Sequence, residues 1–255
     1  MTPDTASNSS RFARVPLSER GTATEEWLPW QRGLPRLPLE LCPGLVVVAP
    51  HPDDETLGFG AAALSIAARG VTVQTIIASD GGAAWPDLSV TERAKLERCR
   101  RNESRRAAAV LGLPQPTFLG LPDGGLADQE SRLADILSTH LSARGAGTWC
   151  AATWRGDGHP DHEAVGRAAA VAVSRTDSVL VEYPVWMWHW ARLGQAGIPW
   201  QHAARVVPDP DAAQRKRLAT EVFQSQLVPG GANRDPVLPR HVLARLQSVG
   251  EVVFR

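Results

Sequence analysis

The sequence predicts an α/β sandwich built around a mostly parallel sheet, and three observations carry that prediction. From about residue 41 onward, short β-branched runs alternate with stretches of helical periodicity, as they do in successive β-α-β units. Residues 45–49, LVVVA, form a continuous apolar run, which is typical of a strand buried on both faces. A chain of 255 residues with 43% hydrophobic residues is long enough to bury such a core.

The remaining elements follow from periodicity and from the residues that begin and end helices. Ser89 and Glu92 have the spacing of a capping box and Gly112 is a helix-ending residue, so one long helix is predicted between them. Further helices are predicted at residues 61–69, 133–141, 162–173, 210–226 and 241–246. Further strands are predicted at residues 71–79, 148–153, 178–185 and 251–255.

Residues 1–40 differ in composition from the rest of the chain. They are rich in Ser, Thr, Pro and Arg, with Trp27 and Trp30 as large apolar anchors. This composition predicts an extended arm that lies on the surface of a domain. We therefore expect an N-terminal arm, 1–40, followed by a single domain, 41–255.

Charge and cysteine content exclude several classes of protein. The 27 basic and 27 acidic residues cancel, so no overall field attracts the chain to nucleic acid or to an anionic membrane. The basic residues between 93 and 106 are interpreted as a solvated helix face. Cys42, Cys99 and Cys150 form no CxxC pair, which argues against a disulfide framework and a thiolate zinc site. With no apolar run long enough for a membrane span, we expect a cytoplasmic protein, and a homo-oligomer is compatible with the sequence.

The first motif follows the strand at 45–49 directly. It contains His51, Asp53 and Asp54 in the order His-Pro-Asp-Asp-Glu. In a parallel sheet, ligands bind beyond the carboxyl ends of the strands, so this turn is a candidate site. A histidine and a carboxylate three residues apart can reach one cation, while the acid between them points elsewhere.

A second motif, GHPDH at residues 158–162, follows the strand at 148–153. Its His159 and His162 are candidates for a third ligand, and three protein ligands would leave one position open for water. The alternative is that each motif is a turn before a helix N-terminus, where aspartate is a common cap. Acids and histidines gathered at strand ends would, however, repel and desolvate one another without a cation, which favours the metal site.

These motifs and several others give the sequence a specific resemblance. HPDDE-TLGFG at 51–60 and GHPDHEAVGRA at 158–168 carry it, and SDGG at 79–82, RRNESRRAAAVLG at 100–112, LPDGG at 121–125 and KRLATEVFQSQ at 216–226 support it. Over roughly residues 44–230 the chain resembles the zinc-dependent N-acetylglucosaminyl deacetylases of the LmbE-like or PIG-L family. The resemblance implies a Rossmann-like three-layer fold, and an enzyme that removes acetyl from an N-acetyl amino sugar or glycoconjugate.

The resemblance also implies roles for individual residues. His51, Asp54 and His162 are expected to bind zinc, or Fe²⁺ in its place. Asp53 is expected to act as the general base, because a metal-bound water has a pKa low enough for an ordinary carboxylate to take its proton. His159 is expected to face the substrate carbonyl.

Further residues are expected to orient the site or to bind the substrate. Asp161 lies between the two histidines of the second motif and is expected to keep one imidazole oriented and cationic. Candidate substrate-binding residues are Asp80, Arg155, Asp157 and His189, with Arg155 or His189 replacing a tyrosine found in some relatives. If residues 183–190 stay extended, Trp186, Trp188 and Trp190 share one side and could stack on a sugar ring.

The functional hypothesis is thus a zinc-dependent hydrolase acting on an N-acetylglucosamine-like substrate. Three alternatives remain: an amidase for another N-acyl metabolite, glycolipid or peptide, a metal-bearing sugar-binding protein without turnover, and a metal-dependent phosphoesterase. The uncommitted acid Asp53 argues against a binding protein. A phosphoesterase would want a second metal or more basic phosphate ligands.

Overall fold

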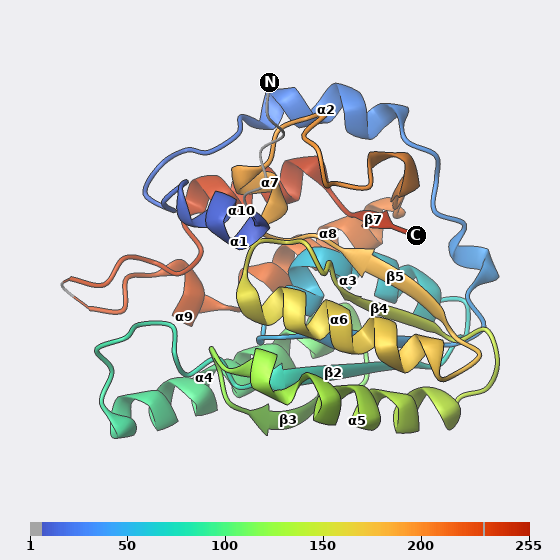
Figure 1. Ribbon diagram of the computed structural model, residues 1–255, viewed down its shortest axis with the longest axis horizontal. Coiled ribbons are helices and arrows are strands. Elements are labelled where there is room, and N and C mark those ends of the chain that lie inside the picture. The colour runs from blue at the N-terminus through green and yellow to red at the C-terminus, as the bar shows by residue number, and fades with distance from the viewer. Residues whose placement is uncertain (1–6, 232) are drawn as a thin grey trace.

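The computed structural model describes residues 7–231 and 233–255, and within them the chain forms one seven-stranded sheet (Figure 1). The strand order is β3-β2-β1-β4-β5-β7-β6; β1 to β5 are parallel and β7 runs antiparallel to its two neighbours. The strands are β1 Leu45–Ala49, β2 Val73–Ser79, β3 Thr117–Leu121, β4 Trp149–Thr153, β5 Val179–Tyr183, β6 Ala203–Arg205 and β7 Val252–Phe254.

Helices cover both faces of this sheet. The α-helices are α1 Asn8–Ala13, α2 Thr24–Gly33, α3 Asp54–Ala67, α4 Val90–Leu111, α5 Glu130–Ser142, α6 Pro160–Ser174, α7 Met187–Trp190, α8 Pro210–Thr220, α9 Gln224–Leu227 and α10 Arg240–Val249. Short 3-10 turns lie at Leu39–Leu41, Leu126–Gln129 and Trp200–His202. Of the described helices, none is long and apolar enough to span a bilayer.

Alternation along β1 explains the three layers. Leu45 and Val47 face the core that contains α3, whereas Val46 and Val48 face the core under α5 and α6. All five residues of β1 are buried, as its continuous apolar run predicts. The predicted α/β sandwich with a mostly parallel sheet is confirmed.

Most predicted elements are present, with instructive exceptions. The capping box of Ser89 and Glu92 begins α4, and Gly112 ends it at φ 68°. The strands β3 and β6 were not predicted, because β3 carries a left-handed Gly120 and β6 is three residues long. Helix α3 begins at Asp54, earlier than predicted, because the turn before it leads straight into the helix.

The expectation of an extended arm is wrong for the described part of residues 1–40. Residues 1–6 lie outside the described residues, and the rest contain α1 and α2. Ser7 caps α1 by accepting a hydrogen bond from the Ser10 amide. In α2, the fully buried Trp27 packs edge-on against Trp188 at a centroid distance of 5.1 Å, so this segment joins the core. The division into arm and domain stays a prediction.

The segment YPVWMWHW is also not extended as expected. Strand β5 ends at Tyr183 and α7 begins at Met187. The chain turns there because the buried carboxylate of Asp157 accepts hydrogen bonds from three successive backbone amides, those of Val185, Trp186 and Met187, at 2.9 to 3.0 Å. The tryptophans of this segment therefore do not form one flat face.

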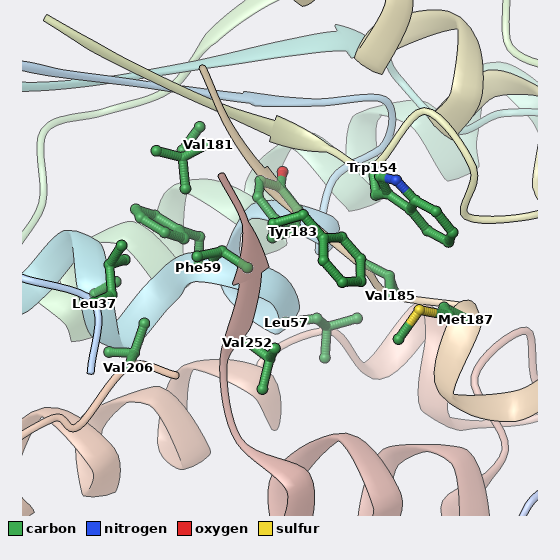
Figure 2. Packing of buried hydrophobic residues seen from close by; sticks show 14 of the residues in the cluster. Leu37, Leu57, Phe59, Trp154, Val181, Tyr183, Val185, Met187, Val206 and Val252 are labelled. Carbon is green, nitrogen blue, oxygen red and sulfur yellow. The ribbon is translucent and has the colours of Figure 1, made fainter. Parts of the chain in front are cut away.

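Helix α3 packs so closely against Tyr183 that only a glycine fits at position 58. A Cβ added at Gly58 would overlap the ring of Tyr183, whose hydroxyl donates to the Val48 carbonyl at 2.8 Å. Phe59 stacks on the same ring at 6.0 Å (Figure 2). One tyrosine thus ties β5, β1 and α3 together.

A buried ion pair holds the middle of α3. Lys216 of α8 lies 2.8 Å from Glu251 and donates to the Leu57 carbonyl at 2.7 Å. The two oxygens of Glu251 accept from the amides of Ala61 and Ala62 at 2.7 and 2.8 Å. In an α-helix the carbonyl of residue i faces the amide of residue i+4. Lys216 bonds to the carbonyl of Leu57 and Glu251 to the amide of Ala61, so the ion pair contacts both members of one such i, i+4 pair.

We expect Glu251→Ala to destabilise the protein by about 3–5 kcal/mol, because it leaves the Lys216 charge buried and unpaired. Arg175→Ala is the matched control: it breaks a pair with Asp135 whose side chains are 48% and 72% exposed, and should cost about 0–1 kcal/mol. Urea unfolding curves measure both. Equal shifts in the two midpoints would contradict the assignment.

Candidate metal centre

The first motif forms a strained turn between β1 and α3. Asp53 has φ 133° and, of the described residues, is the one non-glycine with positive φ. Its amide donates to Glu55 at 3.0 Å, and Arg100 of α4 donates to the Pro52 carbonyl at 2.9 Å. Strain of this kind persists where the surroundings fix it, and it concentrates at functional sites.

The second motif forms a turn between β4 and α6. His159 is the N-cap of α6, and Asp161 and His162 lie in its first turn. Because β1 and β4 are parallel neighbours, their carboxyl ends share one edge of the sheet and bring the two turns together. The strand order also reverses direction between β1 and β4, which is where open α/β sheets bind ligands.

Three buried side chains converge on one point. Oδ2 of Asp54 lies 3.2 Å from Nδ1 of His51 and 3.3 Å from Nε2 of His162. The three ligand atoms lie within 4.8 Å of one another. Within the described residues, Nε2 of His162 completes no hydrogen bond of ordinary geometry, although it is fully buried. Two imidazole nitrogens and one carboxylate oxygen make a donor set that suits zinc, so these residues fit a metal ion.

Charge supports the same fit. Burial disfavours charge at these positions, but the neighbouring Asp54 and Asp157 raise the pKa of His162 to about 9. The pKa of Asp54 is held well below its usual range, against burial, by His162 and His51. The buried carboxylates therefore demand positive charge, which either protons on the imidazoles or a bound cation supplies.

A second group surrounds the other nitrogen of His51. Nε2 of His51 lies 3.1 Å from Oδ2 of Asp161 and 3.0 Å from Oδ1 of Asp123. His51, His159 and Asp161 also have the spacing to hold a metal ion. The oxygens of Asp161, however, already accept from the amides of Gly124 and Leu126 at 2.8 and 3.1 Å. This arrangement orients His51 and leaves its Nδ1 for the first group.

His159 lies close to the other two imidazoles, and its own ring is neutral. Burial and the charges of His162 and His51 lower the pKa of His159 to about 3. Its Nδ1 accepts a hydrogen bond from the Asp161 amide at 3.2 Å. The neutral ring therefore carries its proton on Nε2. The imidazole that Asp161 contacts is that of His51, whose pKa Asp123 and Asp161 raise against the effect of burial.

Asp53 stands beside the centre without belonging to either ligand group. Its Oδ1 accepts from the buried Arg100 at 3.3 Å, and burial raises the pKa of this carboxyl to about 8 against the charge of Arg100. Asp53 lines a pocket of about 150 Å³ together with His51, Asp54, Leu57, Ala83, Ala84, Arg100, Asp123, His159, Trp186, Val237 and Leu238. The lining thus combines the polar groups of the centre with apolar side chains.

The candidate substrate-binding residues lie elsewhere or bind other partners. Asp157 is fully buried, and the hydrogen bonds that it accepts from three backbone amides fix the start of α7. Its Oδ2 lies 2.9 Å from Nδ1 of His162, so it orients that imidazole. Arg155 pairs with Glu182 at 2.9 Å, and Asp80 pairs with Arg101. His189 faces the carbonyls of Val15 and Pro16 at 3.2 and 3.3 Å. None of these four residues is among those that line the pocket.

Two of the pocket residues, Asp123 and Arg100, have no role assigned in the sequence analysis. Asp123 follows β3, and its other oxygen accepts from the Ala83 amide at 2.6 Å. Arg100 was grouped with the solvated face of α4. The helical spacing could have shown that Arg100 is buried, since it lies on the same helix face as Ser104, Ala107 and Leu111, all of which are buried.

Comparison with known proteins gives a family. The family model for GlcNAc-PI de-N-acetylase, PIG-L, matches residues 46–173, just over half of the chain. A 1D-myo-inositol 2-acetamido-2-deoxy-alpha-D-glucopyranoside deacetylase from Mycobacterium sp. (strain KMS) is 31% identical, over 67% of this chain and 61% of that protein. The chain thus spans less than two thirds of the length of this relative.

Solved structures share the fold. A conserved protein from Thermus thermophilus matches with a TM-score of 0.56 and 26% identity, over 79% of this chain and 84% of that one. The N,N'-diacetylchitobiose deacetylase from Pyrococcus horikoshii matches with a TM-score of 0.58 and 20% identity, over 80% and 78%. Both motif turns lie inside the region that the family model matches, and the chain belongs to the PIG-L family.

Proposed function

We propose that the protein is a metal-dependent N-deacetylase that hydrolyses the acetamide of an N-acetylglucosamine-like sugar or glycoconjugate to a free amine and acetate. The observation that carries the proposal is the convergence of His51 and His162 on one oxygen of Asp54, with the uncommitted acid Asp53 in the adjoining pocket. The mycobacterial relative is described as a deacetylase of an acetamido-glucopyranoside, which supports this substrate class.

His51, Asp54 and His162 are the proposed metal ligands, with zinc the ion that their donor atoms suit and Fe²⁺ the alternative. When bound, such an ion lowers the pKa of its water towards neutrality and polarises the amide carbonyl. Asp157 and Asp161 hold the two imidazoles from behind, each through a nitrogen that does not face Asp54. These carboxylates fix the tautomer of each ligand.

Asp53 is the proposed general base. Burial raises the pKa of its carboxyl, while the charge of Arg100 opposes that effect and the charge of a bound metal ion would add to this opposition, favouring the carboxylate form that the role requires. Arg100 donates to its Oδ1, so Oδ2 is the oxygen that accepts a proton from the attacking water. After the carbon–nitrogen bond breaks, the same oxygen returns the proton to the leaving amine. One water and one amide thereby give one acetate and one amine, and the carboxylate is regenerated.

His159 is proposed to stabilise the charge that develops on the carbonyl oxygen. The Asp161 amide occupies Nδ1, so Nε2 carries the proton and can donate it in a hydrogen bond to that oxygen. A neutral imidazole is sufficient for this role. The apolar lining residues Leu57, Trp186 and Leu238 limit access of bulk water to the reacting groups.

A panel of substrates tests the proposal directly. We expect amine release from N-acetylglucosamine conjugates, its loss after treatment with a chelator, and its recovery with Zn²⁺ or Fe²⁺. Phosphate esters and N-acyl peptides serve as comparison substrates, assayed with the same preparation. Release of phosphate without any amine from the sugars would refute the deacetylase assignment and favour the phosphoesterase. Activity confined to the N-acyl peptides would favour the amidase.

Paired substitutions separate the base from the metal ligands. Asp53→Ala should retain the metal but lose about 10²- to 10⁴-fold in kcat, which is the usual contribution of a general base. His162→Ala should lose both metal and activity, because it removes a ligand. Metal analysis and acetate release measured on the same samples distinguish the two variants. Full activity in Asp53→Ala would eliminate this residue as the base.

A further inference from the structure

Helix α1 contacts the backbone of the turn that precedes the second motif. Nδ2 of Asn8 donates to the Gly156 carbonyl at 2.8 Å. Gly158 has φ 94°, and a Cβ added there would lie 2.7 Å from Nε1 of Trp190, 2.8 Å from Cβ of Phe12 and 3.3 Å from the Asn8 carbonyl. The turn 156–158 therefore leaves no space for a side chain at Gly158, and both α1 and Trp190 of α7 pack against it.

This turn carries the groups that orient the proposed centre. Asp157 lies between the two contacted glycines and contacts His162 through its Oδ2. Gly158 immediately precedes His159, and its amide donates to Glu163 of α6 at 3.1 Å. Ser9 of α1 donates to the other oxygen of Glu163 at 3.4 Å. Helix α1 thus contacts the residue before Asp157 and, through Glu163, the first turn of α6.

The same helix supports one wall of the pocket. The Phe12 ring stacks on Trp186 at a centroid distance of 5.4 Å, and Trp186 lines the pocket beside His51 and Asp53. In Figure 1, α1 lies next to α7, although a large part of the chain separates the two helices in sequence. Phe12 thus links α1 to a residue that lines the pocket.

Two further observations distinguish α1 from ordinary packing. None of its residues is fully buried, although Phe12 packs against the main core. It also lies outside residues 46–173, the region that the family model matches. Asn8 and Ser9 bond to the turn and to Glu163, while Arg11 bonds to the Ala196 carbonyl.

We propose that α1 is a positioning clamp for the second motif, with Asn8 and Phe12 as its positioning residues. Asn8 holds the Gly156 carbonyl, and Phe12 packs on both Gly158 and Trp186. The clamp fixes Asp157, and through it the imidazole of His162. This inference rests on the proposed function for its catalytic consequence, but the rigidity of the turn and the metal affinity can be measured without any substrate.

The test uses full-length Phe12→Ala and Asn8→Ala, with Ser10→Ala as the matched control. Ser10 is an exposed residue of the same helix whose hydroxyl contacts Ser7. Phe12→Tyr keeps the ring and is the conservative rescue. Three quantities are measured: amide hydrogen exchange over residues 154–163, the zinc dissociation constant, and kcat and KM for acetate release.

Both alanine variants should exchange faster over residues 154–163 and bind zinc about 3- to 10-fold more weakly, a smaller loss than the 10- to 100-fold typical of a direct partner of a ligand. We expect a lower kcat with a smaller change in KM, and wild-type values for Ser10→Ala and Phe12→Tyr. Wild-type exchange and zinc affinity in both alanine variants would overturn the clamp. Asn8→Ala keeps the test decisive if Phe12→Ala fails to fold.

The two proposals fail differently. If the alanine variants loosen the turn and weaken zinc binding while the wild type releases no acetate from any sugar, the clamp is supported and the deacetylase is refuted. If the wild type is active and both alanine variants retain wild-type exchange, zinc affinity and kcat, the deacetylase is supported and the clamp is refuted.

Discussion

One buried carboxylate oxygen contacts two buried imidazoles, and the positions of the other site residues depend on this contact. Oδ2 of Asp54 lies within 3.3 Å of both His51 and His162. Such a group is costly in a core unless every polar atom around it has a partner. Asp157 and Asp161 contact the outer ring nitrogens of His162 and His51, and backbone amides fix each of these carboxylates, three for Asp157 and two for Asp161. The side chains are therefore oriented by main chain that the sheet and helices have already placed.

The same logic explains the backbone of the first motif. A helix that starts directly after a strand allows two adjacent acids to take different directions, because Asp53 adopts positive φ and Asp54 enters α3. The unfavourable conformation is held by Glu55 on one side and Arg100 on the other. Separation of a proposed ligand from a proposed base thus depends on one strained residue.

The centre could be predicted from the sequence because parallel strands bring their carboxyl ends to one edge, so two motifs that follow β1 and β4 had to meet. Prediction failed where the deciding contact is distant in sequence. Asp157 was expected to contact substrate, but it is fully buried and binds amides some thirty residues away. His189 was favoured because the segment 183–190 was assumed to be extended. The hydrogen bonds from its backbone amides to Asp157 instead turn the segment into α7. Arg100 was grouped with the other basic residues of α4, although its helical spacing from Ser104, Ala107 and Leu111 places it on the buried face.

The ion pair of Lys216 and Glu251 also bears on how the chain acquires its structure. Glu251 bonds to the amide of Ala61, which precedes it by 190 residues, so α3 reaches its full hydrogen bonding only when Glu251 has packed against it. Such contacts between distant parts of a chain form late and slowly, because a long loop must close first. The helix that begins with Asp54 therefore gains this support late in folding, and loss of Glu251 would disturb a centre that lies far from it in sequence.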